Sequence, residues 1–478
     1  MREPGRRSVI TGLMAGALVL GLDPVTRSWV TAAHAEGPFD RLPPLDGRLR
    51  LDNAALDAMA DDFGHIVSRR PRAVLEPGSV QDVVAMMRYC RRHGIQVAGR
   101  GQGHSTNGQS QVEGGLVIDL GPLDSLEIRA DRAVAGAGAT WLALVQAALA
   151  RGKTPPVLAD YLGLSIGGTL SAGGLGGAIG HHGAQVDNVL ELQVVTGKGD
   201  LVTCSPTVRR DLFDAVRSGL GQVGVIVRAT VRLIDAPSTV RRYNLYYPTV
   251  EALTAAQRRM VDEGRFGYLE GQLARQEDGS WTFMMEAVAF DATPEDDAAL
   301  IGDLGHASVT IDDLTYFDFL NRIAPVVEIL IQLGEWARPH PWLDSVLPGS
   351  RTDELVTGAL PELTPDLIGM SAVILLYPIP TAKVKAPLLR LPDEKHAFLF
   401  SLLRTSSPGA ADAATMTAAN RAFYERVRAA GGGWYPIGTL PLSRDDWRRH
   451  FGGAWPAFSA AKRTYDPSKI LTPGQGIF

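Results

Sequence analysis

Residues 98–109 read Ala98-Gly99-Arg100-Gly101-Gln102-Gly103-His104-Ser105-Thr106-Asn107-Gly108-Gln109 and directly follow an expected strand. Consecutive backbone N–H groups in such a loop can bind an anion such as a pyrophosphate. The spacing differs from the dinucleotide motif G-x-G-x-x-G, which opens a helix, because a second strand is expected at 116–120. The loop therefore predicts a phosphate-containing cofactor and argues against NAD.

His104 is the residue of this loop with the most specific chemistry. A neutral imidazole nitrogen can attack the electrophilic methyl carbon of a flavin and stay bonded to it. A histidine in a cofactor loop therefore indicates a covalently attached flavin. The alternative is an ordinary loop histidine held by hydrogen bonds.

The loop completes a β-α-β unit. A strand is expected at 73–75, a helix at 80–93 with Ser79 as its cap and Gly94 at its end, and a second strand at 95–98. The elements that follow predict a mixed α and β domain. Further strands are expected at 116–120, 133–136, 190–196, 201–203 and 224–233, and further helices at 141–150 and 211–218.

A second glycine-rich segment lies between Asp160 and Gly183, where nine glycines occur, including the pairs at 167–168, 173–174 and 176–177. Glycine allows the backbone to approach a ligand closely. This segment is therefore a second candidate wall for a large cofactor.

The length of 478 residues exceeds a single core of about 150 residues, so several domains or one large composite domain are expected. After Pro237 the sequence changes to longer amphipathic stretches and alternating strands, such as 281–288 and 372–376. We therefore expect a domain boundary near residue 240. Residues 447–478 return to a turn-rich, aromatic sequence.

The composition is that of an ordinary soluble protein, with a net charge of -5 and 21% charged residues. Nucleic acid is therefore an unexpected partner, and no metal site is predicted. Only Cys90 and Cys204 are present, so the chain does not depend on a dense disulfide framework. One bridge is an open alternative to two buried free thiols.

The N-terminus has the order of a cleavable export signal. Arg6 and Arg7 precede an apolar stretch from Val9 to Leu22, and the small-residue triplet 33–35 follows. Arg6-Arg7-Ser8 resembles the twin-arginine signal, which exports proteins already folded around a cofactor. We expect cleavage after Ala35 and an extracytoplasmic or secreted mature chain. An ordinary export signal or an uncleaved anchor is the alternative, and no later segment is expected to span a membrane.

The loop at 98–109 closely resembles the flavin-attachment loop of the cytokinin dehydrogenases, FAD enzymes of the vanillyl-alcohol-oxidase type. The resemblance covers the chain from about residue 70 to the end. Its other blocks are Asp160-Tyr161-Leu162, Gly167-Gly168-Thr169-Leu170-Ser171, Gln185-Val186-Asp187-Asn188-Val189, Gly219-Leu220-Gly221-Gln222-Val223-Gly224, Tyr316-Phe317-Asp318-Phe319-Leu320, Pro339-His340-Pro341-Trp342-Leu343 and Tyr465-Asp466-Pro467-Ser468-Lys469-Ile470-Leu471-Thr472-Pro473-Gly474-Gln475.

This resemblance implies an α+β fold with a two-part FAD-binding domain of the vanillyl-alcohol-oxidase (PCMH) type and an inserted α+β substrate domain. The expected parts are a signal at 1–35, an FAD domain at 50–240, a substrate domain at 241–440 and a C-terminal return at 441–478. His104 is expected to form the single covalent bond to the flavin. Some relatives attach FAD through a histidine and a cysteine, and the glycine-rich segment here lacks that cysteine. The other FAD contacts that the resemblance implies are Arg100, Gly101, Gly103, Ser105, Gln109, Asp160, Thr169, Ser171, Gly174, Ile226 and Gln475.

Asp160 matches the family's catalytic aspartate, which accepts a proton from the reacting N–H of the substrate. Oxidation of an amine or alcohol carbon removes a proton and a hydride, so a base is required. Glu270 resembles a second family carboxylate that faces the substrate. The alternatives are a turn cap for Asp160 and a solvated strand residue for Glu270.

The substrate side departs from the family. Val384 stands where the family has a tryptophan that contacts substrate, and the sequence from Gly432 to Ile437 also differs from that of the family. An aromatic-rich stretch, which is either a pocket wall or ordinary core, comprises Tyr316, Phe319, Trp336, His340 and Trp342.

The resemblance implies oxidation of a secondary amine, an N6-isoprenoid adenine, with a quinone-like compound or oxygen as electron acceptor. The departures leave open an exported FAD oxidase of a different amine, alcohol or sugar. A flavin-binding protein without turnover is a third alternative, which the presence of Asp160 disfavours.

Overall fold

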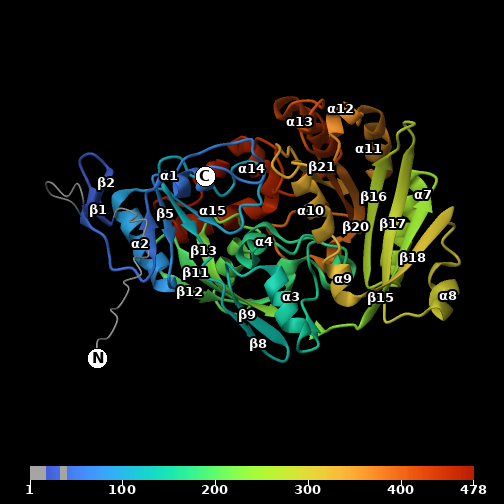
Figure 1. Ribbon diagram of the computed structural model, residues 1–478, viewed down its shortest axis with the longest axis horizontal. Coiled ribbons are helices and arrows are strands. Elements are labelled where there is room, and N and C mark those ends of the chain that lie inside the picture. Colours follow the sequence, from blue (N-terminus) through green and yellow to red (C-terminus); the bar gives the residue numbers. More distant parts are fainter. Residues whose placement is uncertain (1–17, 33–39) are drawn as a thin grey trace, which may run out of the picture.

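The computed structural model describes residues 18–32 and 40–478. It contains a mixed helix-and-sheet part that is drawn on the left of Figure 1 and a part built around one large sheet on the right. The C-terminal helices, drawn in red, lie back against the first part. The α+β fold that the sequence predicts is confirmed.

The first part contains a four-stranded sheet in the order β4-β5-β7-β6, in which β5 and β6 run parallel to β7. Helix α2 connects β5 to β6 and ends at Gly94, whose φ of +62° suits glycine. Ser79 is its N-cap residue, but the Ser79 hydroxyl makes no capping hydrogen bond. The bounds are β4 (Arg48–Arg50), β5 (Ala73–Glu76), α2 (Val80–His93), β6 (Val97–Arg100) and β7 (Leu116–Asp119).

The strand that precedes the glycine-rich loop lies two residues later than predicted. It spans Val97–Arg100 because Val97 pairs with Leu116 on one side and forms a bridge to Leu471 on the other. Gly99 and Arg100 therefore belong to the strand, and the loop begins at Gly101.

A five-stranded antiparallel sheet in the order β12-β11-β13-β9-β8 completes the first part. Helix α4, which carries the glycine pair at 167–168, packs on β13 and β9. The bounds are β8 (Leu126–Ile128), β9 (Arg132–Gly136), α3 (Trp141–Leu149), α4 (Ile166–Ala172), α5 (Ile179–His182), β11 (Val189–Thr196), β12 (Leu201–Cys204), α6 (Arg210–Val216) and β13 (Gly224–Arg232).

The second part is an eight-stranded antiparallel sheet in the order β18-β15-β17-β16-β20-β21-β19-β22. Helices α7, α11 and α13 pack against this part and against one another (Figure 1). The bounds are β15 (Thr239–Tyr247), α7 (Val250–Glu263), β16 (Tyr268–Arg275), β17 (Trp281–Phe290), β18 (Ser308–Thr315), α9 (Tyr316–Leu320), α10 (Ala324–Gln332), β19 (Leu343–Pro348), α11 (Thr352–Ala359), β20 (Val373–Pro380), β21 (His396–Leu403), α13 (Ala413–Ala429) and β22 (Gly433–Trp434).

The C-terminal segment returns to the first part through α14 (Arg444–Phe451) and α15 (Trp455–Tyr465), of which α15 contacts α6. A buried ion pair fixes this return: Lys462 Nζ lies 2.8 Å from Asp466 Oδ2, and Lys462 also donates to the carbonyl oxygens of Gln222 and Leu471. Asp466 in turn accepts the backbone N–H groups of Ile470 and Leu471.

We expect Asp466→Ala to lower the free energy of unfolding by about 3–5 kcal/mol, because it leaves the buried Lys462 ammonium without its counter-charge. Urea unfolding followed by tryptophan fluorescence measures the change. Glu425→Ala, which breaks an exposed pair with Arg428, is the control and should cost about 1 kcal/mol or less. Equal effects of the two substitutions would contradict the prediction.

Most of the predicted export signal, including Arg6, Arg7 and the cleavage site after Ala35, lies outside the described residues. The end of its apolar stretch falls on β1 (Val19–Asp23), which pairs with β2 (Ser28–Thr31) and β3 (Asp40–Arg41). Cys90 and Cys204 are buried free thiols, not a bridge. Across 18–32 and 40–478, no helix has the length and apolar character needed to cross a membrane.

Candidate active site

His104 is packed among aromatic rings. Its ring stacks on Phe63 with 4.1 Å between centroids, and the centroids of Tyr161, Trp342 and Trp336 lie at 5.1, 5.7 and 5.8 Å. Burial lowers the pKa of His104 to about 3. The imidazole is therefore neutral near pH 7, which is the form that can act as a nucleophile.

The backbone around His104 leaves no room for side chains at two glycines. A Cβ on Gly101 would lie 1.9 Å from Ser165 Oγ, and Gly103 has a φ of +66°. Arg100 points back under the loop and donates to the carbonyl oxygen of Asp61. The loop therefore presents backbone rather than side chains at these positions, as a phosphate cradle requires.

Gln109 and Gln475 lie next to each other although they are 366 positions apart in the sequence. Gln109 Nε2 donates to the carbonyl oxygens of Ile437 and Gly438 at 3.2 and 3.0 Å. Gln475 Nε2 makes only long contacts, 3.5 Å to Gln109 O and 3.4 Å to Leu220 O, and its Oε1 is buried without a partner. An orphaned amide beside a glycine-rich loop fits a polar cofactor such as FAD.

Several other residues expected to contact FAD have partners within the protein. Thr169 Oγ1 accepts the indole N–H of Trp141 at 2.8 Å, and Ser171 Oγ donates to Gly167 O at 2.8 Å, so both hydroxyls stabilise α4 and its surroundings. Gly174, with φ of +74°, donates its N–H to the Tyr435 hydroxyl. Ile226 is buried in β13 and Ser105 donates to Asp62. Their contacts with FAD stay predictions.

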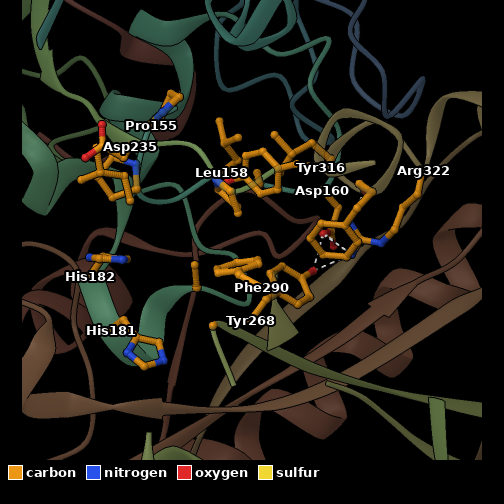
Figure 2. Close-up of a pocket in the computed structure, with 18 of the residues that line it drawn as sticks. Pro155, Leu158, Asp160, His181, His182, Asp235, Tyr268, Phe290, Tyr316 and Arg322 are labelled. Carbon is orange, nitrogen blue, oxygen red and sulfur yellow. Dashed lines mark hydrogen bonds and ion pairs between the residues drawn. The ribbon is translucent and has the colours of Figure 1, made fainter. Parts of the chain in front are cut away.

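Asp160 is held by a tyrosine and an arginine from the second part of the fold. Its Oδ1 accepts the Tyr268 hydroxyl and Arg322 Nη2, both at 2.8 Å (Figure 2). Arg322 Nη2 also donates to the Tyr268 oxygen at 2.5 Å and to Glu286 Oε2 at 3.1 Å. The Arg322 cation therefore offsets the charge of Asp160 and fixes the direction of its carboxylate.

Glu270 lies on the same face of β16 as Tyr268, two residues further along the strand. It is buried, and its Oε1 has no hydrogen-bond partner among the residues that the structure describes. Burial, followed by the neighbouring Asp160 carboxylate, raises the pKa of Glu270 well above its usual value. The site therefore places a carboxyl group whose protonated form is favoured close to the Asp160 carboxyl group, which is paired with arginine.

The Asp160 cluster borders a cavity of about 370 Å³. Figure 2 shows Asp160, Tyr268 and Arg322 joined at one side, with His181 and His182 of α5 toward the other. The rest of the lining is largely apolar. Such a cavity with a few convergent polar groups is the usual form of a small-molecule site.

Tyr161 connects this cluster to the attachment loop, because it follows Asp160 in sequence while its ring contacts His104. The structure thus brings His104, Asp160 and Glu270 to the interface between the two parts of the fold. The aromatic stretch predicted from sequence divides between them: Tyr316 and Phe319 line the cavity, whereas Trp336, His340 and Trp342 surround Phe63 beside His104. The five aromatic residues therefore do not line this cavity together.

Sequence reasoning missed four residues of this region: Asp62, Phe63, Tyr268 and Arg322. Each contacts a predicted site residue that is distant in sequence, as Arg322 contacts Asp160 across 162 positions. No local spacing signals such contacts. The Asp62-Phe63-Gly64 turn is short and polar enough to pass for an ordinary loop.

Comparison with known proteins accords with this geometry. A model of an FAD binding domain matches residues 71–205, and one described as cytokinin dehydrogenase 1, FAD and cytokinin binding, matches 298–478. An uncharacterised oxidoreductase of the fasciation locus of Rhodococcoides fascians is 40% identical over 90% of this chain and 99% of its own. Cytokinin dehydrogenase 1 of Oryza sativa subsp. japonica is 35% identical over 98% and 99%.

The chain belongs to the cytokinin dehydrogenase family of FAD-dependent oxidoreductases. The fold is shared more widely: a crystal structure of 6-hydroxy-D-nicotine oxidase from Arthrobacter nicotinovorans has a TM-score of 0.70 at 22% identity, covering 89% of this chain and 96% of that one. The prediction of an FAD oxidoreductase with a vanillyl-alcohol-oxidase-type fold is confirmed.

Proposed function

We propose that this member of the cytokinin dehydrogenase family oxidises the secondary amine of an N6-isoprenoid adenine, with Asp160 as the base. The observation that carries the proposal is the Asp160 carboxylate, oriented by Tyr268 and Arg322 and lying close to Glu270, whose pKa is raised by burial. An oriented carboxylate can accept a proton from a substrate N–H.

FAD, when bound, supplies the acceptor for the hydride that leaves the carbon next to that nitrogen. Asp160 takes the N–H proton, so the C–N single bond becomes an imine, which water converts to adenine and an aldehyde. A protonated Glu270 can donate a hydrogen bond to a ring nitrogen of the substrate's adenine, because its Oε1 has no partner among the described residues. The electrons then pass to a quinone-like compound or to oxygen.

The experiment is an anaerobic titration of the purified enzyme with isopentenyladenine. We expect loss of the oxidised flavin absorbance near the first equivalent of substrate and recovery when a quinone or air is added. An unchanged spectrum would contradict the proposed substrate. Adenine itself, which lacks the side chain to be oxidised, is the control and should leave the spectrum unchanged.

A second candidate function is oxidation of another amine, an alcohol or a sugar. It is favoured by Val384, which stands on the substrate side where the family has a tryptophan. A panel of such compounds, scored by anaerobic flavin reduction, separates the two candidates. Reduction by cytokinins alone would exclude the second.

Arg322→Gln is expected to slow flavin reduction by substrate about 10-fold or more, because the Asp160 carboxylate loses the hydrogen bond that fixes its direction. Stopped-flow reduction at saturating substrate measures the rate constant. Arg129→Gln, at an exposed pair with Glu127, is the control and should reduce at the wild-type rate. A wild-type rate for Arg322→Gln would contradict the role of Arg322 in orienting Asp160.

We also propose that the chain is exported through its twin-arginine-like N-terminus and that His104 carries the flavin. Export is supported by the order of Arg6, Arg7, the apolar stretch and the small residues before Glu36. N-terminal sequencing of the secreted or periplasmic chain should give Glu36 as its first residue. A chain found only in the cytoplasm with Met1 retained would contradict export.

A further inference from the structure

The segment Asp62 to Gly64, between α1 (Asn53–Met59) and β5, runs alongside the attachment loop and is hydrogen-bonded to it. Phe63 N–H donates to Gly103 O at 2.9 Å, and Gly64 N–H donates to Ser105 O at 3.1 Å. These two bonds bracket His104. The segment is therefore joined to the loop by backbone hydrogen bonds on both sides of His104.

The Asp62 carboxylate holds the part of the same loop that follows His104. Its Oδ2 accepts Gly108 N–H at 2.7 Å and Ser105 Oγ at 3.1 Å, and its Oδ1 accepts Gly64 N–H at 3.0 Å. Asp62 is buried, which raises its pKa to about 6, and its charged form is favoured by these hydrogen bonds and by the nearby Arg100 cation. Burying a carboxylate costs free energy unless hydrogen bonds or a counter-charge compensate for the lost water.

Phe63 fixes the plane of the His104 ring. It lies between two imidazoles, with centroid distances of 4.1 Å to His104 and 4.1 Å to His340 and interplanar angles of 23° and 8°. His340 is itself anchored, because its backbone N–H donates to Gly64 O at 2.9 Å and its ring Nδ1 lies 3.2 Å from Thr405 Oγ1. The stack therefore leaves the His104 ring little freedom to rotate.

Gly64 permits this close approach. A Cβ at residue 64 would lie 2.2 Å from the carbonyl oxygen of Thr106, a contact no side chain can make. The loop and the segment are thus matched in backbone shape as well as in hydrogen bonding.

We propose that Asp62 and Phe63 are positioning residues for covalent attachment of the flavin to His104. Asp62 sets the path of the loop after His104, and Phe63 sets the orientation of the His104 ring. Bond formation between a fixed nucleophile and a bound ligand depends steeply on geometry, and a misplacement of about 1 Å costs on the order of 100-fold in rate. The inference rests on the proposed attachment at His104.

The test compares wild-type protein with Asp62→Asn and Phe63→Leu. Asparagine keeps the size of Asp62, but its single oxygen cannot replace both carboxylate oxygens. Its NH2 group must face either the Gly64 N–H or the Gly108 N–H and Ser105 hydroxyl, and the donors on that side lose their acceptor. Leucine keeps the apolar volume of Phe63 but removes the stacked ring. Asp57→Asn is the matched control, because Asp57 is an exposed carboxylate that lines the same surface groove as Asp62 and His104.

Three readouts are taken on each purified protein: flavin retained in the acid precipitate, total flavin bound before precipitation, and the melting temperature. We expect wild type and Asp57→Asn to retain nearly all flavin in acid. Asp62→Asn and Phe63→Leu should bind FAD but release most of it in acid, and on incubation with added FAD they should form the bond at least about 10-fold more slowly.

Acid-stable flavin at wild-type levels in both variants would overturn the inference and leave the attachment proposal standing. The inference would also be overturned if total bound flavin fell by the same fraction as acid-stable flavin and the melting temperature fell as well. That result would indicate a purely structural role. Flavin released by acid from the wild type would instead refute the attachment at His104 itself, and the positioning role with it.

Discussion

Asp160→Asn is expected to slow anaerobic flavin reduction by substrate about 10²- to 10⁴-fold while FAD stays bound. Asparagine can still accept the hydrogen bonds from Tyr268 and Arg322 through its amide oxygen, so the local geometry is kept. It cannot accept a proton from the substrate. The loss therefore reports the base itself rather than a collapsed site.

Single-turnover reduction in a stopped-flow instrument, at saturating substrate, gives the rate constant directly. Asp131→Asn, at an exposed pair with Arg132, is the matched control and should reduce at the wild-type rate. The visible flavin spectrum and the FAD stoichiometry confirm that the cofactor is present in each variant. A reduction rate for Asp160→Asn within about twofold of wild type would remove Asp160 from the role of base.

His104→Ala is expected to convert an acid-stable flavin into an acid-soluble one. Precipitated wild-type protein should be yellow, and the variant's precipitate colourless with its flavin in the supernatant. His182→Ala, at an exposed histidine of α5, should behave as wild type. A colourless wild-type precipitate would contradict covalent attachment, and a yellow His104→Ala precipitate would place the bond elsewhere.

The same experiment has a predicted pH dependence. An ordinary imidazole with a pKa of about 6.5 is mostly protonated at pH 5 and is then a poor nucleophile. Because burial lowers the pKa of His104 to about 3, its ring should remain neutral between about pH 8 and 5. Attachment during incubation with FAD should therefore continue at pH 5, where an exposed histidine would have lost most of its reactivity.

Local patterns were sufficient for much of the first part of the fold. The predicted helix at 80–93 and the strands at 73–75 and 116–120 agree with the structure to within one residue, because their apolar periodicity and flanking caps are local features. The strand before the loop shifted because its register is set by Leu116 and Leu471, which are distant in sequence. Strand limits that depend on partners are outside the reach of local patterns.

The candidate site divides in the same way. His104, Asp160 and the glycine-rich segments were found because their motifs are continuous in the sequence and resemble a known family. Tyr268 and Arg322, which orient Asp160, come from β16 and from the turn after α9, and only the packing of the second part against the first brings them there. Asp62 and Phe63 were missed for the same reason.

The sequence by itself determined the class of protein: an FAD-dependent oxidoreductase of the cytokinin dehydrogenase family. It also named His104 and Asp160 as the candidates for flavin attachment and for the base. The tertiary structure decided the chemical state of those residues. Burial among aromatic rings lowers the pKa of His104 to about 3, and burial near Asp160 raises the pKa of Glu270 well above its usual value. Protonation depends on the solvent and charges around a group, and these are set by residues that meet only when the two parts of the chain fold together.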